Sequence, residues 1–190
     1  QSYLEYLDRI FQVSQDDLLM VENYDFKIWD DPNRMIENIR NKDLNLSLCR
    51  VVAGYSWRWQ SKGCETIAQA IREGLEDIEL DGRKYVWNMS NQEWILRGGA
   101  VNEIGCVHTT QGYDLNYVAV IFGHEIDYDD ESDSIVIDRS KYFDSKVKDG
   151  VDDDTLKQYI VNSYKVMLTR GIKGCYVYAC NPRLQNYLKR

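Results

Sequence analysis

The sequence predicts an α/β fold in which a mainly parallel sheet is flanked by helices. Apolar runs of strand length alternate along the chain with segments of helical period, which is typical of this class. The runs Leu48–Tyr55 and Tyr117–Phe122 are apolar almost throughout, as expected for strands that a parallel sheet buries on both faces. With 190 residues, 44% of them hydrophobic, the chain is long enough to form one domain with its own core.

The N-terminal part predicts a helix, a strand and a second helix. Tyr3–Val13 has apolar residues near helical period, so we expect residues 1–23 to form a helical lead-in. Residues 24–29 alternate as a strand does. A helix over residues 32–41 follows, because Asp31 is a suitable N-cap and a proline occupies the first helical position.

The domain proper is expected over residues 24–190, with an insertion at about 56–103. That insertion holds four tryptophans, a turn at Asp81-Gly82 and a short apolar strand at Tyr85–Trp87. It predicts a hairpin and loop packed beside the sheet.

The C-terminal part predicts a further strand at Glu103–Val107 and then, after Phe122, a polar surface excursion over residues 125–154 with one small strand at Ser134–Ile137. The remaining elements expected in this part are a long helix, a last strand and a closing helical turn, at Asp153–Leu168, Cys175–Cys180 and Pro182–Lys189.

Composition excludes several classes of protein. The net charge of −8 argues against a generally basic nucleic-acid-binding protein. No apolar run approaches the roughly 18 residues that span a bilayer, so no membrane partner is expected. Five cysteines, an odd number without Cys-x-x-Cys spacing, favour a reduced cytoplasmic location and no zinc. The acidic loops lack the spacing of a calcium site, so no metal ligands are predicted.

Charge is distributed unevenly near the C-terminus. Residues 125–154 carry twelve acidic and four basic side chains, whereas residues 155–190 carry seven basic side chains and no acidic one. The basic segment has two interpretations: it faces phosphates, or it balances the acidic segment within the fold.

Two polar clusters follow predicted elements and are candidate binding sites, since ligands of parallel sheets bind beyond the carboxyl ends of strands. Arg170 ends the long helix and carries a planar fork suited to phosphate oxygens, although it equally suits the last helical carbonyls. Gln111, Gly112 and Asp114 form the other cluster. The glycine permits positive φ or a close ligand, while the two polar side chains suit a phosphate and a ribose hydroxyl or merely cap a turn.

Two segments resemble signature sequences of a known family. Ile104-Gly-Cys-Val-His-Thr-Thr-Gln-Gly-Tyr-Asp-Leu-Asn-Tyr-Val-Ala-Val-Ile121 and Asn162-Ser-Tyr-Lys-Val-Met-Leu-Thr-Arg-Gly171 resemble the second RecA-like domain of superfamily 1 helicases. The surrounding sequence, including Arg50-Val-Val-Ala-Gly-Tyr-Ser-Trp57, looks most like the DUF2075 group, the Schlafen-like DNA/RNA helicase domain. The resemblance implies a RecA-like, P-loop NTPase-type fold that binds nucleic acid and ATP with Mg.

The resemblance also implies a role for each site residue. Arg170 would act as the catalytic arginine on the γ-phosphate and, together with Gln111, Gly112 and Asp114, would bind the nucleotide. His108 and Thr109 would hold the backbone of a single-stranded nucleic acid, unless the histidine is only structural. Relatives usually have glutamate, which has a longer side chain, where Asp114 stands and often a basic residue where Gln111 stands.

The chain lacks half of such a site. No Gly-x-x-x-x-Gly-Lys-Ser/Thr occurs in it, so it has no phosphate-binding loop of that type. The chain begins with Gln1, and we expect it to be the second half of a larger ATPase whose first RecA-like domain shares the ATP and Mg. The acidic balance and missing loop equally fit a non-catalytic α/β nucleic-acid-binding or regulatory module; a metal-dependent nuclease rests only on the acidic loops.

Overall fold

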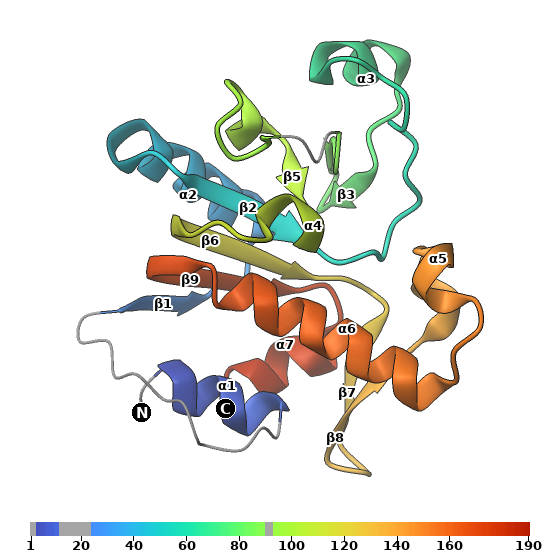
Figure 1. Cartoon of the computed structure of the whole chain (residues 1–190). Coiled ribbons are helices and arrows are strands. Elements are labelled where there is room, and N and C mark those ends of the chain that lie inside the picture. The colour runs from blue at the N-terminus through green and yellow to red at the C-terminus, as the bar shows by residue number, and fades with distance from the viewer. Residues whose placement is uncertain (1–2, 12–23, 90–92) are drawn as a thin grey trace.

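A five-stranded, wholly parallel sheet forms the centre of the domain (Figure 1). The computed structural model describes residues 3–11, 24–89 and 93–190. The strand order across the sheet is β1 (Asp25–Ile28), β9 (Gly171–Ala179), β6 (Leu115–Phe122), β2 (Cys49–Ala53) and β5 (Ile104–Gly105). The predicted α/β class with a parallel sheet is therefore confirmed.

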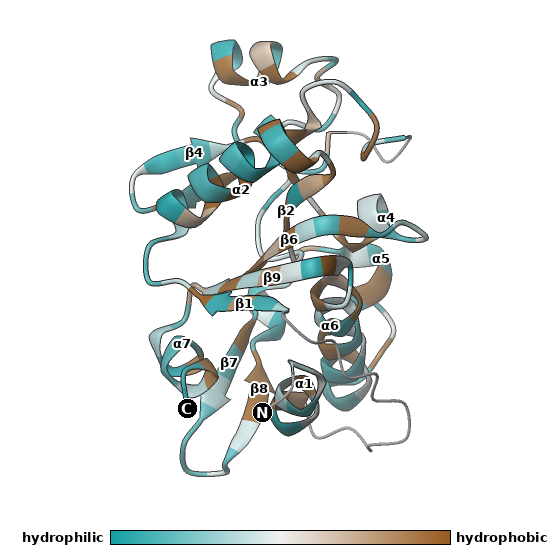
Figure 2. Cartoon of the chain, turned by 90° about the vertical axis from the view of Figure 1, so that its left-hand side faces the viewer, coloured by the Kyte–Doolittle hydropathy of each residue, from teal (hydrophilic) through white to brown (hydrophobic). Residues whose placement is uncertain are grey.

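Helices cover both faces of the sheet (Figure 2). Alternate residues of the central strands pack against the helices of opposite faces. Val118 and Val120 of β6 pack in the cluster that contains α6 (Asp153–Leu168), whereas Ala119 and Ile121 pack with α2 (Pro32–Leu46). Both clusters are fully buried, which explains why the central strands are apolar at almost every position.

The N-terminal elements begin as predicted. Asp31 caps α2 by accepting a hydrogen bond from the Arg34 amide at 2.9 Å, and Pro32 opens the helix. The helix continues past residue 41 because no glycine or proline interrupts the next turn, and it ends at Ser47, whose φ is 56°. The first helix, α1 (Tyr3–Phe11), lies where the lead-in was expected, while residues 12–23 lie outside the described residues.

The insertion contains the expected hairpin and an additional helix. Strands β3 (Ile78–Leu80) and β4 (Arg83–Tyr85) pair around Asp81-Gly82, where both residues have positive φ. The strand predicted at Tyr85–Trp87 thus ends earlier, and Trp87 instead forms an isolated bridge to Ile104. Helix α3 (Ile67–Glu73) was not predicted from the sequence.

The strand predicted at Glu103–Val107 is shorter in the structure. Strand β5 is only two residues long, and a one-turn helix, α4 (Val107–Thr110), follows it. The helix forms because the Thr109 hydroxyl accepts a hydrogen bond from the Cys106 amide at 2.9 Å and donates one to the Cys106 carbonyl at 2.8 Å.

The acidic segment is more than a surface excursion. It forms a hairpin of β7 (Ile126–Asp129) and β8 (Ser134–Ile137), followed by a short 3₁₀ turn, η2 (Arg139–Lys141), and by α5 (Ser145–Lys148). Only the second strand was predicted. Ile126 and Tyr128 are buried in the core, and they alternate with half-buried acidic residues that point to the other face of the hairpin.

The C-terminal elements position the end of α6. That helix has the predicted bounds, and Thr169 caps its end. Strand β9 begins at Gly171, so the loop expected there is shorter, and α7 (Pro182–Leu188) closes the chain. A further 3₁₀ turn, η1 (Ala100–Asn102), precedes β5. None of the helices in the described ranges is long and apolar enough to cross a membrane.

Candidate nucleotide and nucleic-acid site

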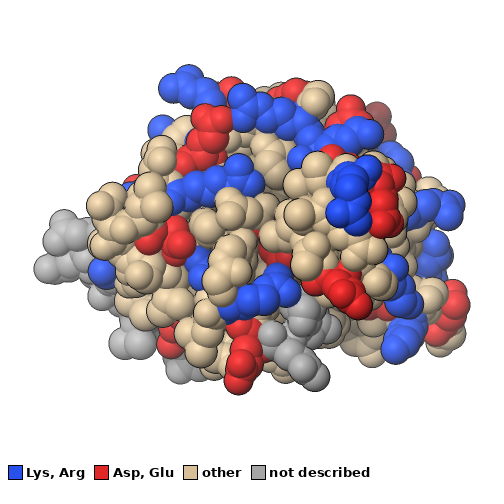
Figure 3. Space-filling view, turned by 90° about the horizontal axis from the view of Figure 1, so that it is seen from above, with Lys and Arg blue, Asp and Glu red and all other residues tan. Residues whose placement is uncertain are grey.

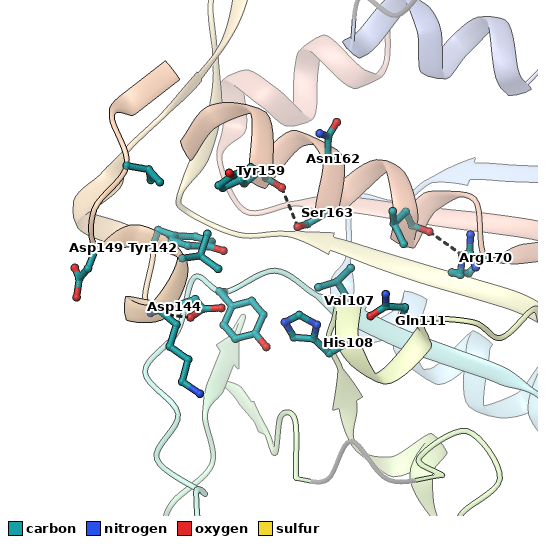
Figure 4. Close-up of a pocket in the computed structure, with 15 residues that line it drawn as sticks. Val107, His108, Gln111, Tyr142, Asp144, Asp149, Tyr159, Asn162, Ser163 and Arg170 are labelled. Carbon is teal, nitrogen blue, oxygen red and sulfur yellow. Dashed lines mark hydrogen bonds between the residues drawn. The ribbon is translucent and has the colours of Figure 1, made fainter. Parts of the chain in front are cut away.

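A groove of about 790 Å³ runs along α6 between α4 and α5. Figure 4 shows Gln111 and Arg170 towards one end, Asp144 and Asp149 at the other, and His108 between them. The groove is lined by Tyr55, Val107, His108, Gln111, Tyr142, Asp144, Lys146, Val147, Asp149, Val151, Tyr159, Asn162, Ser163, Val166 and Arg170. Three of the six predicted site residues therefore share one groove.

Arg170 is held at the amino end of β9. The Leu115 amide donates a hydrogen bond to the Arg170 carbonyl at 2.8 Å, which joins the two signature segments directly. A side chain at Gly171 would place its Cβ 2.2 Å from the Gly174 carbonyl oxygen, so only glycine allows the strand to begin there. Gly171 thus fixes where the arginine leaves the helix.

The guanidinium of Arg170 is only partly occupied within the fold. Its Nε donates to the Val166 carbonyl at 3.0 Å, which is the helix-end contact that the sequence left open as an alternative. Among the described residues, no carboxylate lies within ion-pair distance of its Nη groups. The Nη groups are therefore available to an anion.

The two candidate segments begin from opposite edges of the sheet. His108 follows β5 and lies beyond a carboxyl end, as expected. Arg170 precedes β9 and lies at an amino end, so the expectation of a carboxyl-end loop is wrong for this residue. His108 and Arg170 nevertheless line the same groove, because α4 leads from β5 towards the start of β6 and contacts α6.

Gln111, Gly112 and Asp114 are exposed and lie just before β6. Gln111 ends α4 and lines the groove, whereas the other two do not. Gly112 has a φ of 82°, and a Cβ there would meet nothing within 4 Å, so the positive φ is what requires glycine. Asp114 precedes Leu115, whose amide binds the Arg170 carbonyl, so this carboxylate lies on the segment next to the arginine.

The two residues expected to hold nucleic acid differ in exposure. His108 is exposed on α4, and its ring centroid lies 5.9 Å from that of Tyr55. Thr109 is 3% exposed, and both of its hydroxyl contacts are with Cys106. Thr109 therefore shapes the helix that presents His108.

Several groove residues were not identified from the sequence. Tyr55 follows β2 at its carboxyl end, which is the signal that would have found it. Burial raises the pKa of Tyr55 and Tyr142 well above the usual range, so both phenols stay neutral. The Ser163 hydroxyl donates to the Tyr159 carbonyl at 2.9 Å and can still accept a hydrogen bond.

The groove has no single charge sign. Arg170 and Lys146 are basic and Asp144 and Asp149 acidic, and the Asp144 carboxylate accepts a hydrogen bond from the Lys146 amide at 3.1 Å as it caps α5. The face seen from above likewise mixes both signs (Figure 3). Over the described ranges, no three His, Cys, Asp or Glu side chains are grouped so that they could hold a metal ion.

Comparison with known proteins identifies the family. Residues 1–181 match the family described as Schlafen group 3, DNA/RNA helicase domain. The chain belongs to this helicase-domain family. An uncharacterized protein of Saccharomyces cerevisiae is 35% identical to it over 179 residues. That alignment covers 90% of this chain and 37% of the yeast protein. No solved structure gives a significant match.

The Schlafen helicase-domain match contains the whole candidate site. Both signature segments, from Ile104 to Gly171, fall inside the matched residues, whereas α7 lies wholly beyond them. Family membership supports a helicase-related function that involves nucleic acid.

Proposed function

We propose that this chain is the C-terminal motor domain of an ATP-dependent DNA or RNA helicase or translocase. The observation that carries the proposal is the single groove that joins His108 and Gln111 of one signature segment to Arg170 of the other. These residues are distant in the sequence, and a domain that merely kept the fold would have no need to bring them together with an arginine left free at its Nη groups.

ATP with Mg would bind between this domain and a first RecA-like domain that supplies the phosphate-binding loop. The residues of this chain fit the side of the nucleotide that faces away from the first domain. Arg170 offers an unpaired fork to phosphate oxygens, and Gln111 offers an exposed amide. Asp114, on the adjoining segment, offers a carboxylate that suits a ribose hydroxyl. Cleft closure would follow because the nucleotide binds better when both domains contact it.

A single strand of nucleic acid would lie in the groove beside His108. The imidazole, the Lys146 ammonium and the Asn162 amide can all donate to phosphate oxygens. Such contacts carry no sequence information, which suits a protein that moves along a strand.

Binding of labelled single strands to the chain at two salt concentrations tests the nucleic-acid half of the proposal. We expect weak binding with a steep salt dependence, because only a few phosphates are neutralised. His108→Ala should weaken binding by several-fold. The matched control is His124→Ala, which changes the other of the chain's two histidines, also exposed but outside the groove.

An ATPase assay of the same preparation tests the shared-site half. The isolated chain should hydrolyse no ATP above background, and turnover at about 1 s⁻¹ would contradict a site divided between two domains. Tight, salt-insensitive or sequence-specific binding by the chain alone would instead favour the non-catalytic module, for which the net charge of −8 is the supporting observation.

A further inference from the structure

A row of aromatic rings leads from the groove to the surface of the insertion. The ring of His108 lies 5.9 Å from that of Tyr55, which in turn lies 4.9 Å from Trp87, measured between centroids. Trp87 is buried, and its ring centroid lies 6.4 Å from that of Trp59. The row therefore connects the predicted strand-binding histidine with a tryptophan that is 37% exposed.

A second exposed ring lies beside this row. Phe143 is 38% exposed, and its amide donates to the Tyr55 carbonyl at 2.7 Å, which fixes the phenylalanine next to the groove. Trp59 and Phe143 are thus both partly exposed, and Arg58, which precedes Trp59 in the chain, lies over the Phe143 ring and so brings the two segments together. Trp59 packs against the buried Trp87, and the backbone of Phe143 is tied to that of Tyr55.

Each exposed ring is accompanied by a cation. The Arg58 guanidinium lies 5.2 Å from the centroid of Phe143, and the Lys62 ammonium lies 5.5 Å from that of Trp59. Neither cation has a carboxylate within ion-pair distance in the part of the chain that the structure describes. The segment 55–63 contains these two basic residues and no acidic one, although the chain as a whole is acidic.

We propose that Trp59 and Phe143, with Arg58 and Lys62 beside them, form a stacking platform for unpaired bases. The proposal rests on the proposed function, because the strand whose bases stack here is the one whose backbone lies beside His108. Aromatic rings accept any base, and interleaved cations neutralise the phosphates between them. A duplex does not present base faces, so the platform selects single strands.

Two strands of equal length and charge separate stacking from phosphate binding. The probes are labelled oligothymidylate and the same backbone with abasic residues. The parent chain should bind the base-bearing strand more tightly than the abasic strand, on the order of 10-fold for each lost stack. Trp59→Leu should reduce that preference, Trp59→Phe should retain most of it, and Phe143→Leu should act as Trp59→Leu does.

Two controls make the result specific. Leu96→Ala changes another exposed apolar side chain of the insertion, 69% exposed, and should leave both affinities unchanged. Arg58→Ala should weaken binding of both strands equally, whereas Arg34→Ala, on helix α2 and outside the groove, should weaken neither.

The outcomes distinguish the two proposals. Equal affinity of the parent for both strands, or a preference that Trp59→Leu and Phe143→Leu leave intact, overturns the platform while leaving the proposed function in place. A parent chain that binds neither strand overturns the proposed function and the platform with it.

Discussion

The two ends of the basic C-terminal segment use their charges differently. After β9, Arg183 pairs with Asp127 at 2.7 Å and Arg190 pairs with Asp130 at 2.8 Å. Lys189 pairs with Asp30. Before β9, the side chain of Arg170 donates to the Val166 carbonyl and pairs with no carboxylate of the described residues, although it belongs to the same run of basic residues.

The difference follows from the direction of the strands. In a parallel sheet, β6 and β9 end at the same edge, so the acidic hairpin after β6 and helix α7 after β9 lie side by side. Arg170 lies at the opposite edge, beyond reach of the hairpin. Charge balance therefore describes α7, whereas at the end of α6 Arg170 has no such carboxylate partner among the described residues, and its role towards phosphates stays a prediction.

The largest expected effect concerns the available cation. In a full-length protein that carries this chain, Arg170→Ala should lower nucleic-acid-stimulated ATP hydrolysis by about 10³–10⁵-fold, because a positioned arginine acts mainly on charge in the transition state. ATP binding should change little, since the first domain would hold most of the nucleotide. Steady-state hydrolysis with saturating single strand measures the effect.

Arg170→Lys sharpens the same test. A lysine is a point charge and cannot reproduce the bidentate fork, so it should restore little of the activity. Unchanged turnover in Arg170→Ala would contradict the assignment. An equal loss in Arg170→Ala and Arg183→Ala would show instead that the segment only holds the domain together.

The sequence predicted those helix bounds that depend on periodicity and on capping residues. The bounds of α6 followed from its periodicity, and the start of α2 followed from Asp31 and Pro32. Strand β7 was missed because the acidic residues of the run hid the alternation of Ile126 and Tyr128, which are buried.

The site was predicted only in part, for a related reason. The resemblance implied a nucleotide role for Gln111 and Arg170 and a separate nucleic-acid role for His108, and the structure brings all three into one groove. The groove also needs Tyr55 and Lys146 from distant segments. Tyr55 could have been found only from its place at the carboxyl end of a predicted strand, and Lys146 carries no local signal of its role. Their position depends on strand order and on the packing of α5, which no local pattern specifies.

The next largest effect is expected at Asp127, the carboxylate that pairs with Arg183. Asp127 accepts hydrogen bonds from the Tyr128 and Leu184 amides and from Arg183, so it caps α7 from a neighbouring strand. Asp127→Ala should lower the free energy of unfolding by about 1–2 kcal/mol. Urea denaturation measures it. No loss of stability would mean that α7 does not depend on the hairpin, and the comparison would fail on that side.

A buried acid at the start of the hairpin gives a pH-dependent effect. Glu125 is fully buried, its Oε1 accepts a hydrogen bond from the Tyr164 hydroxyl at 2.6 Å, and burial raises its pKa above the ordinary value of 4.5. The folded protein therefore keeps this proton at pH values where the unfolded chain has lost it. Stability should fall as pH rises from about 4.5 through the raised pKa, and stay lower above it.

Glu125→Gln tests this loss of stability at higher pH, because glutamine resembles the protonated acid. The variant should gain stability relative to the parent as pH rises, on the order of 1.4 kcal/mol for each unit by which the pKa is raised. Denaturation at a series of pH values measures the difference. A difference that does not vary with pH would show that the carboxyl group titrates normally, and the fold would then tolerate a buried charge at this position.

The smallest effect is expected at Arg183, and it completes the comparison. Its side chain is 58% exposed, and exposed ion pairs contribute little because solvent and salt screen them. Arg183→Ala should leave ATP hydrolysis unchanged and lower stability only slightly. In an Asp127→Ala background even that loss should vanish, since the partner has been removed. Denaturation of the two single variants and the double variant measures this coupling. If Arg183→Ala destabilises the chain as much in the Asp127→Ala background as in the parent, its charge serves some other contact, and the division between a paired α7 and an available Arg170 would need to be redrawn.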